Sequence, residues 1–144
     1  MSLGLFARRM AIVSSRMEPE LEATMRKVTL AVDQAVVLAT PVDTGRARSN
    51  WVVSRGKATS KKIPPYAPGS KLGIGESGNL QGALDQARSE MSSYKLAEGD
   101  IYISNNIHYV SILNGGTSAQ APRGFIEIAV NAGVAAVHNA RIIK

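Results

Sequence analysis

Two short strings in this chain match motifs that carry chemistry in enzymes. The first, Gly73 to Gly78, reads G-x-G-x-x-G, the pattern that cradles a pyrophosphate at the start of a helix. That use requires a buried strand directly before the glycines. Here the preceding residues are P-P-Y-A-P-G-S-K-L, and prolines do not form a buried parallel strand. We therefore interpret the string as a flexible glycine hinge ahead of a helix.

The second string, Asp43-Thr44-Gly45, matches the signature of aspartic proteases. That chemistry needs two carboxylates that share a proton, on loops between apolar strands. In this sequence the tripeptide follows a long helical pattern and leads into an arginine-rich segment. The better interpretation is a turn in which Asp43 and Thr44 form local side-chain hydrogen bonds and Gly45 adopts a positive φ.

The remaining reactive side chains form no recognisable constellation. The chain has no cysteine, so disulfides, thiol nucleophiles and thiolate metal sites are excluded. Its two histidines, His108 and His138, are too few for a histidine-built metal centre and have no evident catalytic partner. The sequence therefore predicts no catalytic residues, no metal and no cofactor: a protein that is not an enzyme.

The net charge of +6 is concentrated in one stretch. Residues 45–78 hold seven basic side chains against one acidic side chain, Glu76, so the whole excess lies there. Such asymmetry favours a polyanionic partner, and a solvated lysine-rich loop is an equally good interpretation. The candidate DNA-facing or partner-facing residues are Arg46, Arg48, Arg55, Lys57, Lys61 and Lys62.

The first half of the chain has clear periodicity. Apolar residues from Met17 to Ala39 recur every three or four positions, which predicts a long helix with Pro19 in its first turn and Pro41 as its stop. Alternation over 46–55 predicts a strand, with Trp51 facing the core and the arginines on the opposite face. Residues 56–78 have no periodicity and predict a long excursion.

The second half repeats the pattern of helix and strand. A helix is expected over 80–94 with Ser77 or Asn79 as its cap, then a strand over 100–105 and a helical turn over 109–113. A loop over 114–124 leads to a C-terminal helix that begins at Phe125.

This order predicts a small α+β fold, with long N-terminal and C-terminal helices packed on a small β-sheet. The expected domain spans 17–144 and contains the extended loop 57–78, and 1–16 form an N-terminal arm. No apolar run reaches the roughly 18 residues that span a bilayer, so no membrane partner is expected. The arginines within the first fifteen residues make a secretory signal unexpected.

Three segments in order resemble a known family. They are T-P-V-D-T-G-R-A-R-S-N-W (40–51), I-S-N-N-I-H-Y-V-S-I-L-N-G-G-T-S (103–118) and Q-A-P-R-G-F-I-E-I-A-V (120–130). Together they are similar to the tail-completion or neck proteins that join head and tail in tailed bacteriophages. The excursion at 57–78 is longer than the compact hairpin that this family would lead us to expect.

The resemblance implies a structural protein of the virion, assembled in the bacterial host cytoplasm. It implies a homo-oligomeric ring, usually six-fold, between the head connector or adaptor and the tail tube or tail terminator protein. Double-stranded DNA would pass through the lumen without sequence specificity. The family-motif turn and interface residues are Asp43, Thr44, Gly45, Asn114, Gly116, Ser118, Gln120 and Pro122.

Two alternatives stay open at this point. A small basic nucleic-acid-binding accessory protein would need exposed aromatic side chains within its basic groove, and residues 45–78 offer Trp51 and Tyr66 alone. The loop 114–124 is expected at a subunit contact. It could equally be an internal turn in which Gln120 satisfies backbone groups.

Overall fold

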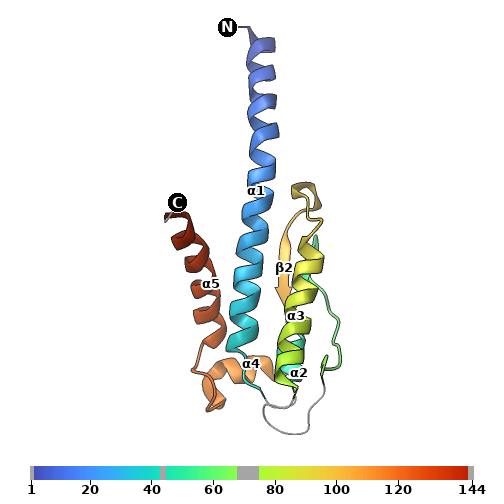
Figure 1. The fold of residues 1–144 in the computed structure, drawn as a ribbon, viewed down its shortest axis with the longest axis vertical. Coiled ribbons are helices and arrows are strands. Elements are labelled where there is room, and N and C mark those ends of the chain that lie inside the picture. Colours follow the sequence, from blue (N-terminus) through green and yellow to red (C-terminus); the bar gives the residue numbers. More distant parts are fainter. Residues whose placement is uncertain (1, 43–44, 68–74, 143–144) are drawn as a thin grey trace.

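The computed structural model describes residues 2–42, 45–67 and 75–142, and its fold is α+β, as the sequence predicts. Figure 1 shows α1 in the middle, α5 on one side of it, and α3 with the small sheet on the other. The helices in the described ranges are α1 (Leu3–Ala39), α2 (Arg46–Ser49), α3 (Glu76–Met91), α4 (Val110–Ile112) and α5 (Phe125–Ile142). A 3-10 turn covers Leu96–Glu98, and a π-type turn covers Leu113–Thr117.

Helix α1 starts earlier than the sequence suggested. Its N-cap is Ser2, whose side chain accepts a hydrogen bond from the backbone of Leu5, so Pro19 lies inside the helix. The prediction that Pro19 occupies the first turn was wrong. That prediction assumed that the proline lies in the first turn, where the N–H that it lacks has no partner within the helix. Apolar residues spaced three and four apart nevertheless continue from Leu3 through Met17, and the helix runs through the proline.

The end of α1 was predicted correctly. Helical geometry stops at Ala39, and Thr40 is extended, as expected for a residue that precedes a proline. The Thr40 hydroxyl and backbone N–H both donate to the carbonyl of Val36, and Trp51 Nε1 donates to the Thr40 hydroxyl at 2.7 Å. Trp51 is therefore in the core, as its position in the sequence indicated.

The segment after the turn is only partly a strand. Residues Arg46–Ser49 form the short helix α2, and β1 (Val52–Arg55) begins later than expected. β1 pairs antiparallel with β2 (Ile101–Ser104), with Val52 opposite Ser104. The amide of Gln86 on α3 bonds both the N–H and the carbonyl of Val53, and so occupies backbone groups that the two-stranded ladder leaves unused.

The core lies on both sides of α1. One cluster joins α1, α2, α3, α4 and α5 around Val36, Val37 and Trp51, and a second joins α3 to the sheet around Val53 and Met91. The approach of α5 to α1 is close: a Cβ on Gly133 would lie 2.7 Å from the Cα of Val32. Only a glycine fits there, and it brings the two helix backbones together.

Candidate functional site: the basic segment and its turn

Arg48 is a buried structural residue. Its side chain is 6% exposed, and its guanidinium donates to the carbonyls of Leu38 and Thr40 and to Glu76 Oε1 at 2.6 Å. The expectation that Arg48 faces away from the core was wrong. It assumed a strand, whereas α2 turns this side chain toward the C-terminal end of α1, where unpaired carbonyls attract a cation.

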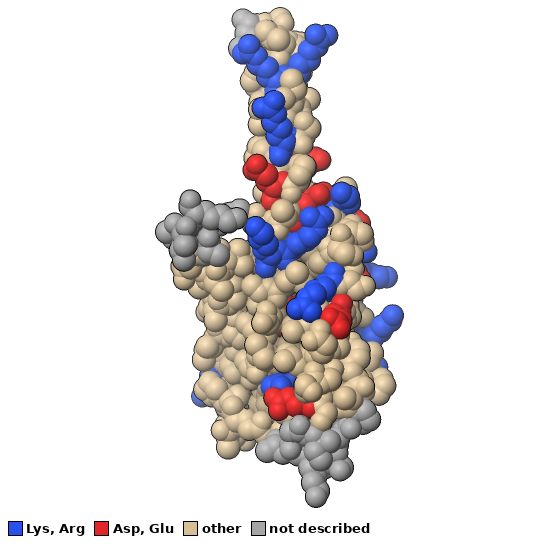
Figure 2. Space-filling view, in the orientation of Figure 1, with Lys and Arg blue, Asp and Glu red and all other residues tan. Residues whose placement is uncertain are grey.

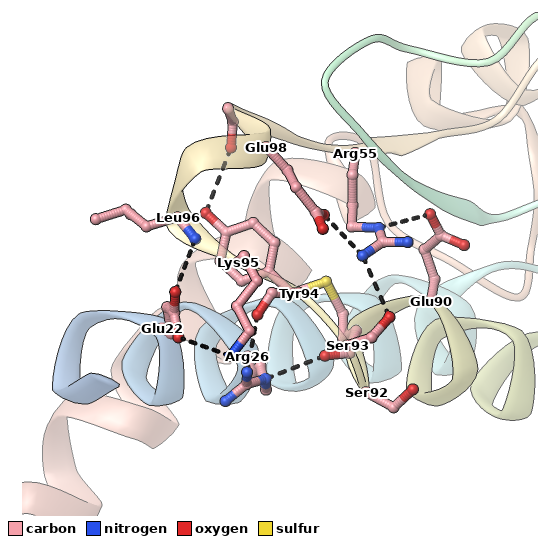
Figure 3. Close-up of polar contacts among 12 residues, drawn as sticks. Glu22, Arg26, Arg55, Glu90, Ser92, Ser93, Tyr94, Lys95, Leu96 and Glu98 are labelled. Atoms are coloured by element: carbon pink, nitrogen blue, oxygen red, sulfur yellow. Dashed lines mark hydrogen bonds and ion pairs between the residues drawn. The ribbon is translucent and has the colours of Figure 1, made fainter. Parts of the chain in front are cut away.

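Arg55 is also committed to internal contacts. Its Nε lies 3.1 Å from Glu90 Oε1 and its Nη1 lies 2.7 Å from Glu98 Oε2, so two carboxylates neutralise one guanidinium (Figure 3). These contacts tie β1 to the end of α3 and to the 3-10 turn. A side chain held in this way is a poor candidate for contact with phosphate.

The same region anchors α1 (Figure 3). Arg26 donates to the carbonyl of Met91, the last residue of α3, and to that of Tyr94, three residues further on. Glu22 accepts from the backbone N–H of Leu96 at 2.9 Å. Cations at carbonyl-rich helix ends are favourable. The cluster is therefore an internal clamp on α1, and the sequence pattern gave no sign of it because its partners lie more than sixty residues apart.

The long excursion is held by side-chain amides. We call residues 56–67, its described part, the strap. Asn50 donates to the carbonyl of Ile63 and accepts from its backbone N–H, and Asn106 donates to the carbonyls of Thr59 and Lys61. Asn79 does the same for both backbone groups of Ala67. These side-chain hydrogen bonds take the place of the backbone hydrogen bonds that a neighbouring strand would form with the strap.

The strap presents the exposed part of the basic segment. Lys57, Lys61 and Lys62 are exposed on it, and Arg46 is exposed at the start of α2. Within the described ranges none of these four side chains forms an ion pair, in contrast to Arg48 and Arg55. Figure 2 shows basic side chains along the edge that the strap follows in Figure 1. The six predicted cations thus divide into four that are available and two that are not.

The turn before α2 depends on Gly45, as predicted. Its φ is +80°, and a Cβ there would lie 1.9 Å from the Asn79 amide nitrogen. The Asn79 carbonyl oxygen accepts from the hydroxyl of Ser49 and the N–H of Ala67. Asn79 is therefore a buried link between turn, strap and α3, and not the cap of α3, which is Gly75. Asp43 and Thr44 lie outside the described residues.

The loop 114–124 makes clear internal contacts. The Gln120 amide donates to the carbonyl of Val42 and accepts from its N–H, both at 2.9 Å, so Gln120 does satisfy backbone groups. Asn114 accepts from the backbone N–H of Ile126 and donates to the carboxylate of Glu127, both in the first turn of α5, and Gly116 has a φ of +94°. The expected subunit contact stays a prediction.

Other turn residues of this loop have modest roles. Ser118 accepts from the backbone N–H of Gln120, and Pro122 lines a groove between α1 and α5. A cavity of about 370 Å³ lies where the loop meets the turn at 41–47, and its wall includes Arg46, Tyr109 and Gln120. All three family-like segments therefore meet at one place in the fold.

The described residues form no cluster of metal-ligating side chains, with three or more His, Asp or Glu residues together. Of the G-x-G-x-x-G string, Gly75 caps α3 with a φ of +77°, while Gly73 and Ile74 lie outside the described residues. No helix within the described ranges is both long and apolar enough to cross a membrane.

Comparison of this chain with protein-family models, with curated proteins and with solved structures finds no match. The chain's own residues offer three features that bear on function: an exposed basic strap, a turn and a loop that contact each other, and a helical arm.

Proposed function

We propose that this protein is a structural component of a tailed-bacteriophage virion, a ring subunit at the head–tail junction through which DNA passes. The observation that carries the proposal is the occurrence of three family-like segments in order, over 40–51, 103–118 and 120–130. The contacts of Gln120 with Val42 and of Asn105 with the Ala47 carbonyl join these segments in the fold. A shared structural unit would account for their occurrence together.

The strap supplies the surface that faces DNA in this proposal. Lys57, Lys61 and Lys62 are free cations on this segment, and Arg46 is a fourth at the start of α2. Their attraction to phosphate is independent of sequence. A conduit for a genome requires such contacts, because base-specific bonds would hold the DNA in place. The buried Arg48 and the paired Arg55 have no part in it.

Negative-stain imaging and native mass measurement of the purified full chain test the ring. We expect closed rings of several copies with a central opening. A protein that stays smaller than a ring at all concentrations, and that is absent from the head–tail junction of purified virions, would contradict the proposal.

The strap is tested by replacing Lys57, Lys61 and Lys62 with glutamine. The salt dependence of duplex DNA binding should fall, with a loss of up to about 2.7 in the slope of log K against log salt if all three contact phosphate. The control replaces three exposed cations elsewhere, Lys27, Arg88 and Lys95, at the same change in charge. Equal effects of both triple variants would contradict a specific role for the strap.

A basic nucleic-acid-binding accessory protein is the second candidate. It is favoured by the exposed lysines and by Tyr66, which is 43% exposed on the strap. Against it, Trp51 is buried and bonded to Thr40, so it offers no base-stacking face. A Tyr66→Ala variant that loses affinity for single strands, in a protein that forms no ring, would favour this second function.

A further inference from the structure

The N-terminal part of α1 carries an uncovered apolar stripe. Its members recur every three or four residues, which places them on one side of the helix. We define the stripe by Leu3, Phe6, Met10, Val13, Met17 and Leu21. Their exposed fractions run from 44% to 86%, and Figure 1 shows this part of α1 standing clear of the body.

A second apolar feature lies on the same side of α1, in the body. It is a groove of about 440 Å³ between α1 and α5, and we call it the α1–α5 groove. Leu38 and Ile128 line it and are 49% and 56% exposed. Val28 lies three helical turns after Met17, and Ala35, which lines the groove, lies two turns after Val28. Residues separated by whole turns lie on the same side of a helix, so the stripe continues into the groove.

The exposed area is large for a chain that acts alone. Six side chains about half exposed present on the order of 600–700 Å² of apolar surface, near the roughly 800 Å² that each partner buries in a standard interface. Isolated soluble proteins rarely leave such a patch uncovered. The exposed surface of α5 is also apolar. Glu127 is the one charged residue between Phe125 and Asn139, and the side chains of Ile128 and Val134 are exposed.

We propose that a second copy of this chain covers the stripe, in a reciprocal antiparallel contact. Because stripe and groove lie on one side of the molecule, two copies that face each other in opposite directions place each stripe over the other's groove. The result is an isologous two-fold interface. A parallel arrangement would hold Arg8, Arg9 and Arg16 of both chains at the same level, and the opposite direction separates them.

This contact goes beyond the ring proposed above. Ring closure uses a rotation between neighbours, whereas this interface uses a two-fold axis. A head–tail junction has two different faces, so the two-fold contact belongs to the free chain in solution and not to the ring inside the virion. A basic amphipathic helix can also lie on an anionic lipid surface. A second copy is the better occupant, because lipid on the stripe would leave the α1–α5 groove uncovered.

The first test is the mass of the full chain in solution, by light scattering and sedimentation. A Met10→Glu/Met17→Glu variant should halve the mass of the wild-type assembly, whether that assembly is a dimer or larger. The control, Ala11→Glu/Ser15→Glu, adds the same charge on the opposite side of α1 and should leave the mass unchanged. Circular dichroism checks that both variants keep the helix.

The second test uses the absence of native cysteine. A Phe6→Cys chain mixed with a Leu38→Cys chain should form a mixed disulfide, and neither should cross-link efficiently with itself. Predominant Phe6→Cys self-cross-linking would overturn the antiparallel arrangement. A wild-type chain with the same mass as the Met10→Glu/Met17→Glu variant would overturn the interface. A monomer whose stripe is needed to bind phosphatidylserine vesicles would replace it with a lipid surface.

Discussion

Among single residues, Asp33 is the most unusually placed. It is fully buried on α1, and within the described ranges neither of its carboxylate oxygens has a hydrogen-bond partner. Burial raises the pKa of Asp33 from its ordinary 3.8 to about 7, because a charged carboxylate loses its hydration there. Its charge also raises the pKa of Tyr66, after the larger effect of that phenol's own burial.

Because of Asp33, the free energy of unfolding should fall as pH rises. Between pH 4 and pH 7 the folded state binds a proton that the unfolded state has released, so this group's destabilisation grows with pH and is complete above about pH 7. A shift from 3.8 to about 7 corresponds to about 4 kcal/mol. At pH 4 we expect Asp33→Asn to change the free energy of unfolding little. At pH 8 the same substitution should clearly raise the free energy of unfolding.

Denaturant unfolding at several pH values measures this difference. Asp85→Asn is the control, because Asp85 is 60% exposed and pairs only with Arg88 among the ion pairs of the described chain. Parallel pH dependences for wild type and Asp33→Asn would show that Asp33 is not the group responsible.

At the scale of elements, the strap is held by amide side chains in place of regular secondary structure. Asn50 is fully buried and donates to the carbonyls of Arg46 and Ile63 while it accepts from the N–H of Ile63. One side chain therefore joins α2 to the strap. Removing it would leave three backbone groups without their partner, at about 1–3 kcal/mol for each one that stays buried.

We expect Asn50→Ala to release the strap while the helices stay folded. Trypsin should then cleave after Lys57, Lys61 and Lys62 at least several-fold faster than in the wild type, because a protease needs an extended, detached segment. The site of cleavage is read by mass spectrometry. Asn131→Ala, at an exposed position of α5, serves as the control, and equal cleavage rates in the two variants would show that Asn50 does not hold the strap.

At the scale of the whole molecule, the arm and the body have different sources of stability. Residues 3–21 are exposed throughout, and the contacts that fix α1 begin at Glu22 and Arg26. Helical stability in proteins comes mainly from packing of an apolar face. The contacts described for the body therefore do not involve residues 3–21, and the body does not depend on the arm.

Removal of residues 2–16 should leave the thermal midpoint of the body nearly unchanged when both chains are measured in a dissociated state. The full chain carrying Met10→Glu/Met17→Glu provides that reference. A fall of several degrees in the midpoint of the truncated chain relative to it would mean that the arm packs on its own body. Calorimetry of both proteins at the same pH and salt is sufficient.

The sequence by itself determined the features that depend on local periodicity and on special residues. Four features were predicted because each follows from backbone geometry within a few residues. They are the helix that ends at Ala39, its stop before Pro41, the positive φ of Gly45 and the helix that begins at Phe125. The core position of Trp51 followed from its side of an apolar pattern, even though part of that pattern is helical.

Only the tertiary structure decided which cations are available. Arg48 is buried because the fold brings it to the carbonyls that end α1, and Arg55 is neutralised by Glu90 and Glu98, which are 35 and 43 residues away. Local sequence gives the charge of an arginine, but burial and pairing depend on which distant groups surround it. The free lysines, the strap that holds them and the uncovered stripe are for the same reason properties of the folded chain.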